Sequence, residues 1–140
     1  MNIAPARTAM PPFDQARVDR LMEDAGIDVL FATSKHNTQY LLGGYKFIFF
    51  SAMDAIGHSR YLPIVIYEKG GPDHAAYIGN RMEGGEHQNN PFWTPTLHLS
   101  SWGTLDAASL GIEHLKTIGK AGARIGIEPS FLPSDAYMAL

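Results

Sequence analysis

One stretch of the chain, residues 25–45, sets the strongest limits on the fold. Its sequence is AGIDVLFATSKHNTQYLLGGY: an apolar run, a polar turn, a short amphipathic segment and two glycines. The run at residues 29–33 follows a helical pattern directly and is almost entirely apolar or β-branched, which is typical of a strand with both faces covered. The sequence therefore predicts a sheet that has helices against both of its sides.

Hydrophobic spacing predicts the remaining elements. Residues 14–25 form a helix that Asp14 caps and Gly26 ends. The expected helices then cover residues 36–42, 104–121 and a last segment that opens at 133–135, and the expected strands cover residues 45–52, 61–67, 74–78, 96–100 and 124–128. Residues 53–60 are predicted to be a loop, residues 69–73 a hairpin turn of about five residues, and residues 79–95 an irregular surface excursion. Gly111 and Gly119 should weaken their helix by about 1 kcal/mol each relative to alanine. The interleaved elements predict a three-layer α/β domain with a mixed sheet of about five or six strands.

Length and composition narrow the class of protein. The 140 residues, 45% hydrophobic and 18% charged, suit one soluble globular domain. We expect residues 1–12 to be a flexible leader and residues 13–140 to form the domain. Because the last helix reaches only about one turn before Leu140, we also expect the natural polypeptide to continue.

Charge and composition also exclude several partners. A net charge of -3 without a basic run argues against nucleic-acid binding, and the absence of cysteine excludes disulfides and thiolate metal sites. No apolar run approaches the roughly 18 residues of a membrane helix, and the N-terminus lacks the apolar core of a signal peptide. A cytoplasmic location is the resulting expectation.

Most familiar catalytic patterns are missing. Gly43 and Gly44 are too short a segment to hold a phosphate, the six histidines lack HxxxH spacing, and Ser109 is not in a GxSxG motif. Asp28 and Glu128 lie at strand ends, so the paired carboxylates of a ribonuclease H-type nuclease are not predicted. The acidic and histidine residues of the excursion are expected to be solvated rather than to bind a metal; they are Glu83, Glu86 and His87.

One group of residues is compatible with ligand binding. Between residues 45 and 61 the chain gathers four aromatic residues before a histidine, an arginine and a last tyrosine; the group comprises Tyr45, Phe47, Phe49, Phe50, His58, Arg60 and Tyr61. Aromatic rings exclude water, and a guanidinium forms paired hydrogen bonds with a carboxylate, which suits a small acidic ligand. The alternative is that the aromatic side chains fill the core while Arg60 extends from a strand edge. The four consecutive apolar residues 47–50 predict that both faces are covered or that one meets a partner chain.

The order of these segments resembles the N-terminal domain of the creatinase and prolidase family, the "pita-bread" metallohydrolases that include Xaa-Pro dipeptidases and aminopeptidases. The resembling segments are RVDRLMEDAGIDVLFATS, HNTQYLLGGY, YLPIVIYEKGGPDHAAYI and ARIGIEPSFLPSDAYMAL. The matching positions are Asn37, Tyr40, Leu41 and Gly43 in the second block and Gly126, Ile127 and Glu128 in the last.

The resemblance implies a fold like that of ribonuclease H without its active site. It also implies that the catalytic residues and their two metal ions belong to a C-terminal domain absent from this chain, with Mn, Co or Zn as the expected metal, although creatinase-like members lack metals. The chain itself is then expected to hold no catalytic residue and no cofactor. In the family this domain packs on the partner subunit of a dimer and overhangs its active site, which assigns Arg60, and less directly His58 and Phe50, to the substrate.

Two functions therefore follow from the sequence. The first is a non-catalytic domain that caps the active site of a hydrolase and supports a homodimer, with a small peptide or amide as substrate. The alternative is a stand-alone module that binds a small ligand without catalysis. Neither function involves nucleic acid or a membrane.

Overall fold

The computed structural model describes residues 10–48 and 61–140. The helices are α1 (Gln15–Ala25), α2 (Lys35–Leu41), α4 (Gly84–Asn89), α5 (Thr104–Thr117) and α6 (Ser134–Ala139), with two 3₁₀ turns, η1 (Arg81–Glu83) and η2 (Pro129–Phe131). The strands are β1 (Val29–Ala32), β2 (Ile64–Glu68), β3 (Gly71–Asn80), β4 (Thr96–Ser101) and β5 (Ile125–Ile127). Strands and helices interleave along the chain, as predicted.

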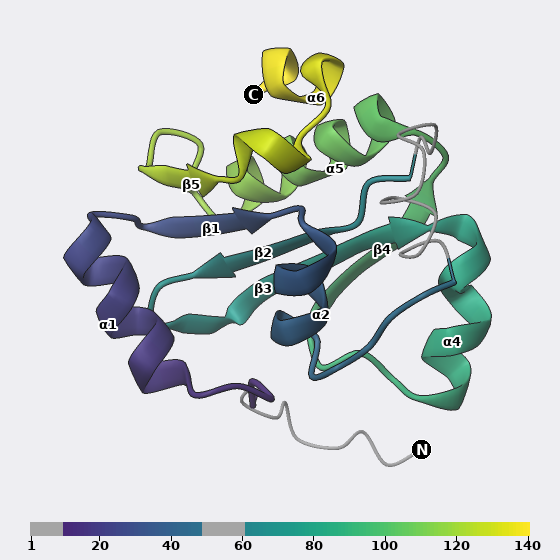
Figure 1. Cartoon of the computed structure of the whole chain (residues 1–140), viewed down its shortest axis with the longest axis horizontal. Helices are drawn as coiled ribbons and strands as arrows, with labels where there is room; N and C mark the ends of the chain where they lie inside the picture. The colour runs from purple at the N-terminus through teal and green to yellow at the C-terminus, as the bar shows by residue number, and fades with distance from the viewer. Residues whose placement is uncertain (1–9, 49–60) are drawn as a thin grey trace.

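The five strands form one mixed sheet in the order β4-β3-β2-β1-β5 (Figure 1). Strand β2 is antiparallel to both neighbours, whereas β1 pairs with β5, and β3 with β4, in parallel. Four strands therefore run in one direction and β2 alone runs in the other. This sheet with its flanking helices confirms the three-layer α/β architecture predicted from the sequence.

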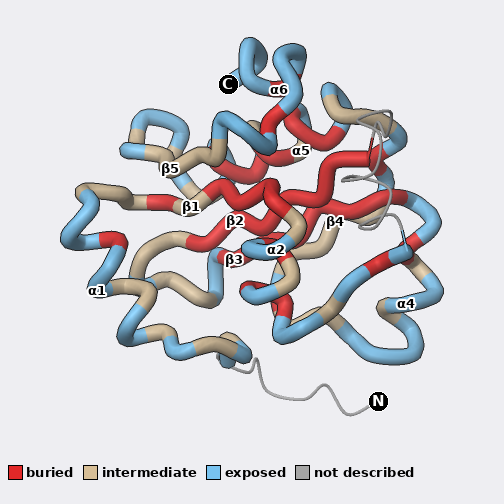
Figure 2. Tube along the Cα trace, in the orientation of Figure 1, coloured by how far each residue is buried: buried red, intermediate tan, exposed pale blue. Residues whose placement is uncertain are grey.

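Alternate residues of the central strands face two separate cores. One core packs α5 and α6 against one face of the sheet; its strand residues are Val29, Phe31, Ile64, Ile66, Ala76 and Ile78. The other face packs against α1 and α2 through Leu30, Ala32, Val65, Tyr67, Ala75 and Tyr77. The central strands β1, β2 and β3 are accordingly among the most buried parts of the trace (Figure 2). This two-sided burial explains the nearly continuous apolar runs of β1 and β2.

Short polar contacts fix α1 beside the β2–β3 hairpin. The Asp14 side chain caps the helix by accepting a hydrogen bond from the Arg17 amide, and Gly26 ends it at φ 71°. Midway along the helix, Asp19 accepts hydrogen bonds from the Tyr67 hydroxyl at 2.7 Å and the Gly70 amide at 3.1 Å. The predicted helix and both of its ends are confirmed.

Three local predictions were wrong. The hairpin turn contains only Lys69 and Gly70, because the left-handed φ of Gly70 (70°) reverses the chain at once and β3 begins at Gly71. Residues 45–48 are not in a strand; Tyr45 and Phe47 are held by their side chains instead of by backbone pairing. Residues 79–95 are not simply irregular, since β3 extends to Asn80 and is followed by η1 and α4.

Helix α5 is shorter than predicted, and its buried face is shifted: Ala108 and Leu115 are buried, together with Ala107, Gly111 and His114. It ends at Thr117, and Gly119 then adopts φ 73°. Its buried residues include Gly111, whose added Cβ would lie 2.7 Å from the Phe31 ring, while Leu105 is half exposed. Gly111 thus makes room for a core side chain. Among the described residues, no helix is long and apolar enough to cross a membrane.

Candidate functional site

The carboxyl ends of four strands, β1, β3, β4 and β5, lie along one edge of the sheet, because these strands run in the same direction (Figure 1). The segments that follow them carry Ser34, Glu83, Trp102 and Glu128, and the residue Tyr61 precedes β2 at the same edge. Ligands of open α/β sheets bind at this edge. The polar and aromatic residues gathered here therefore form the candidate site.

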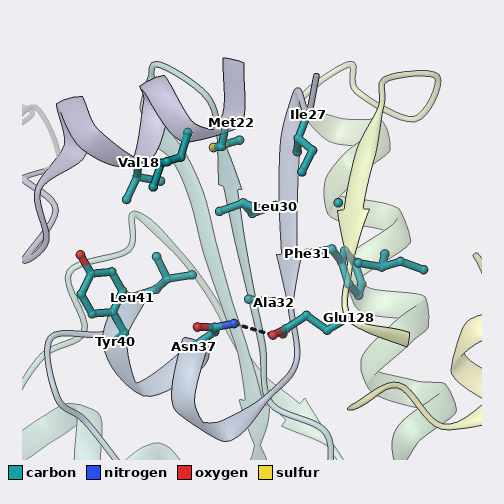
Figure 3. Close-up of a pocket in the computed structure, with 13 residues that line it drawn as sticks. Val18, Met22, Ile27, Leu30, Phe31, Ala32, Asn37, Tyr40, Leu41 and Glu128 are labelled. Carbon is teal, nitrogen blue, oxygen red and sulfur yellow. Dashed lines mark hydrogen bonds between the residues drawn. The ribbon is translucent and has the colours of Figure 1, made fainter. Parts of the chain in front are cut away.

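Glu128 joins the end of β5 to the start of α2. Its carboxylate accepts hydrogen bonds at 2.8 Å from the Thr33 and Ser34 amides and from the Ser34 hydroxyl, and it also accepts one from the Asn37 side chain (Figure 3). Burial alone would raise the pKa of Glu128, but these hydrogen bonds outweigh it and hold the pKa below the ordinary value. The ionised Glu128 side chain thus accepts hydrogen bonds from the two backbone amides that directly precede α2.

An apolar groove of about 310 Å³ lies beside this junction (Figure 3). Side chains of α1, β1, α2 and β5 line it, among them Val18, Leu21, Met22, Leu30, Ala32, Tyr40 and Leu41. Asn37 and Glu128 supply the polar end of the groove. Its volume is at the lower limit for sites that hold small molecules.

A second buried acid, Glu83, lies within a cluster of tyrosines. Its Oε1 accepts hydrogen bonds from the hydroxyls of Tyr45 and Tyr77, each at 2.6 Å, and its Oε2 accepts one from the Asn80 amide at 2.6 Å. The Tyr61 hydroxyl is 3.1 Å from that of Tyr77. Glu83 was predicted to be solvated, but the side chain is fully buried.

Burial dominates the electrostatics of this cluster. It raises the pKa of Glu83 above the ordinary value, although the hydrogen bonds from Tyr45, Tyr77 and Asn80 oppose the shift. Burial likewise raises the pKa values of Tyr45, Tyr61 and Tyr77. The three hydroxyls therefore keep their protons throughout the range in which a carboxyl group titrates.

An exposed arginine and tryptophan lie at the ends of β3 and β4. The Arg81 guanidinium carbon is 5.2 Å from the Trp102 ring centroid, a cation–π distance. The capping-box hydrogen bonds between Asn80 and Glu83 stabilise the turn that carries Arg81. Next to Trp102, the Ser101 hydroxyl donates a hydrogen bond to the Gly79 carbonyl at 2.9 Å. A rigid base therefore presents this pair to solvent.

The residues predicted to contact substrate, Phe50, His58 and Arg60, lie outside the described part of the chain, as does Phe49. Of the same aromatic group, the structure brings Phe47 and Tyr61 together, with ring centroids 6.2 Å apart, and packs Tyr45 beside them. In residues 10–48 and 61–140, no three histidine, aspartate or glutamate side chains are grouped to hold a metal ion.

The role of Glu83 was not predicted from the sequence. The signal that identifies it is the spacing Asn-x-x-Glu directly after a strand, which is the pattern of a capping box. The structure contains this capping box: the Met82 amide donates to Asn80, and the Asn80 amide donates to Glu83.

One known family matches the sequence of this chain. A search of curated proteins found no match to this chain. The family model of the creatinase/prolidase N-terminal domain matches residues 15–140, nearly the whole chain. The sequence resemblance is thereby confirmed, and the chain belongs to the creatinase/prolidase N-terminal domain family.

Proposed function

We propose that this chain is the non-catalytic N-terminal domain of a hydrolase related to the Xaa-Pro dipeptidases, aminopeptidases and creatinases. It caps the active site of a C-terminal catalytic domain and supports a homodimer in the cytoplasm. The family match over residues 15–140 is the observation that carries this proposal. The rigid edge at the carboxyl ends of the strands supports it, since Trp102 and Met82 remain more than half exposed there. Tryptophan, methionine and arginine are enriched at protein interfaces.

In this proposal the substrate is a small peptide or amide that carries a carboxylate. Arg60 binds that carboxylate, and His58 and Phe50 lie near it. The chemistry, and any Mn, Co or Zn ion that it needs, belongs to the catalytic domain. This chain contributes binding, orientation and exclusion of water.

The first test is catalytic. The purified 140-residue chain, supplied with Mn²⁺ or Co²⁺ and an Xaa-Pro dipeptide, is expected to release no proline above the rate in buffer. Release would be followed by chromatography of the reaction products, with the protein that includes the catalytic domain as the positive control. Turnover by the chain alone that stops on addition of a chelator would contradict the proposal.

The second test addresses capping. In the protein that joins this domain to its catalytic domain, Arg60→Ala should raise the KM for a carboxylate-bearing substrate about ten-fold, because one charge-assisted hydrogen bond is lost. Arg20→Ala is the matched control, since Arg20 is exposed on α1. An unchanged KM for the Arg60 variant would remove Arg60 from the substrate site.

The groove beside Glu128 favours a second candidate function, a small-ligand-binding module. An apolar fragment that fills the groove should give saturable NMR shifts at Leu21 and Tyr40, which line it. Saturable binding in the micromolar range would favour this candidate over the capping function. Shifts that stay linear with ligand concentration would reject it.

A further inference from the structure

The two described ends of the connection between α2 and β2 are attached to one buried carboxyl group. Tyr45 lies four residues after the end of α2 and is hydrogen-bonded to Glu83 directly. Tyr61 lies three residues before β2 and is hydrogen-bonded to Tyr77, which is in turn hydrogen-bonded to Glu83. We propose that Glu83 and these tyrosines form a proton-sensitive tether, in which the ionisation of Glu83 sets how both ends of the connection are held.

The directions of the hydrogen bonds around Glu83 depend on whether its carboxyl group is ionised. An ionised carboxylate only accepts, so Tyr45, Tyr77 and the Asn80 amide must all donate to Glu83. A hydroxyl has a single proton to donate. Since Tyr77 directs its proton to Glu83, the Tyr61 hydroxyl must donate to Tyr77.

Protonation of Glu83 reverses part of this pattern. The Asn80 amide can only donate, so the added proton belongs on Oε1, which faces the two hydroxyls. One hydroxyl must then accept from Glu83 and turn its own proton elsewhere. When Tyr77 accepts, it donates to Tyr61, and the Tyr61–Tyr77 hydrogen bond changes direction.

The packing around Glu83 is tight. Glu83 is fully buried, and a Cβ added at Gly79 would lie 2.5 Å from its Oε2. Burial raises the pKa of Glu83, so its titration falls above that of an ordinary glutamate. Among the residues that the structure describes, the other titratable side chains near the cluster include Glu86, which interacts with Tyr45, and His87, which stacks on Phe92.

The sign of the stability effect follows from the direction of that pKa shift. Because the pKa of Glu83 is higher in the folded state than the ordinary 4.5, folded protein binds this proton more tightly than unfolded protein does. The contribution of Glu83 to stability is therefore fully present below pH 4.5. It declines as the pH rises through the folded pKa and is constant above it.

The decisive experiment is a ¹³C NMR titration of the whole 140-residue chain, labelled at glutamate carboxyl and tyrosine ring carbons, from about pH 4 to pH 8. Glu83 is expected to titrate with a midpoint above 4.5, and the Tyr45 and Tyr61 rings should shift with the same midpoint. Exposed Tyr137 serves as the internal control and should not follow. A Glu83 midpoint at or below 4.5, or Tyr45 and Tyr61 signals that do not follow Glu83, would overturn the proposal.

Two variants and a matched control identify the titrating group. In Glu83→Gln the shifts of Tyr45 and Tyr61 at this midpoint should vanish, whereas Glu86→Gln, at an exposed position on α4, should leave them in place. The reverse outcome would assign the titration to Glu86 and overturn the proposal. If Glu83→Gln does not fold, the variant Tyr61→Phe provides the test instead. In that variant the Tyr45 ring signal should still shift with the same midpoint as the Glu83 carboxyl signal. Loss of the Glu83 titration would contradict the tether.

Discussion

A single carboxylate, that of Glu128, explains two separate sequence motifs. Asn37 belongs to the second resembling block and Glu128 to the last, yet their side chains are hydrogen-bonded in the fold (Figure 3). Glu128 also accepts hydrogen bonds from the backbone amides of Thr33 and Ser34, which directly follow β1. The two motifs therefore describe one junction, and the asparagine and the glutamate depend on each other.

Replacing Glu128 should give a pH-dependent loss of stability. Hydrogen bonds lower the pKa of Glu128 below 4.5, so its stabilising contribution is present above pH 4.5 and is lost as the pH falls through the folded pKa. We expect Glu128→Gln to reduce the free energy of unfolding by about 2 kcal/mol near neutral pH, the scale of lost charge-assisted hydrogen bonds. Urea unfolding at a series of pH values measures this difference, which should shrink toward low pH.

Glu113→Gln is the matched control for this prediction. Glu113 is exposed on α5 and pairs only with Lys116 among the described contacts, so its replacement should change stability by less than about 0.5 kcal/mol. A loss for Glu128→Gln that is the same at every pH would show that shape, and not charge, matters at this position.

At the scale of elements, helix α5 shows how packing overrides helix propensity. Gly111 is buried against the ring of Phe31, and an added Cβ would approach that ring to 2.7 Å. We expect Gly111→Ala to destabilise the protein by about 1 kcal/mol, because the cost of overpacking exceeds the roughly 1 kcal/mol gained in helix propensity. Thermal or chemical unfolding of the variant tests this expectation.

Gly85 in α4 provides the opposite case. A Cβ at Gly85 would meet nothing within 4 Å, and its backbone is helical. Gly85→Ala should therefore stabilise the protein by up to about 1 kcal/mol. If Gly111→Ala stabilises the protein as Gly85→Ala is expected to do, the contact between Gly111 and Phe31 is not what determines the effect.

The elements also show how far the sequence can predict this fold and its candidate site. Helix α1 and strands β1 and β2 were predictable because periodicity and the cap residues Asp14 and Gly26 act locally. Helix α4 was not, because its two glycines and polar residues carry no apolar stripe and tertiary contacts through Glu83 hold the segment. The capping-box spacing marks Glu83 in the sequence, but its burial also depends on Tyr45, which is 38 residues away and reaches Glu83 only in the fold.

At the scale of the whole molecule, stability should decline from the centre of the sheet to its edges. Strand β2 lies in the middle of the strand order and is buried over nearly its whole length between the two cores. Strand β5 is short, half-buried and at one edge. Regions with more buried backbone hydrogen bonds open only when the whole domain unfolds.

Hydrogen exchange followed by NMR should resolve this gradient down to single amides of β5. The Arg124 carbonyl accepts from the Val29 amide at 3.2 Å, so in this parallel pair Gly126 also faces β1, while Ile125 and Ile127 direct their amides away from it. We expect the amides of β2 to exchange slowest, Gly126 at an intermediate rate, and Ile125 and Ile127 fastest. Protection of Ile125 and Ile127 equal to that of β2 would contradict an open edge. Protection that grows with protein concentration would show that copies of the chain pair through β5.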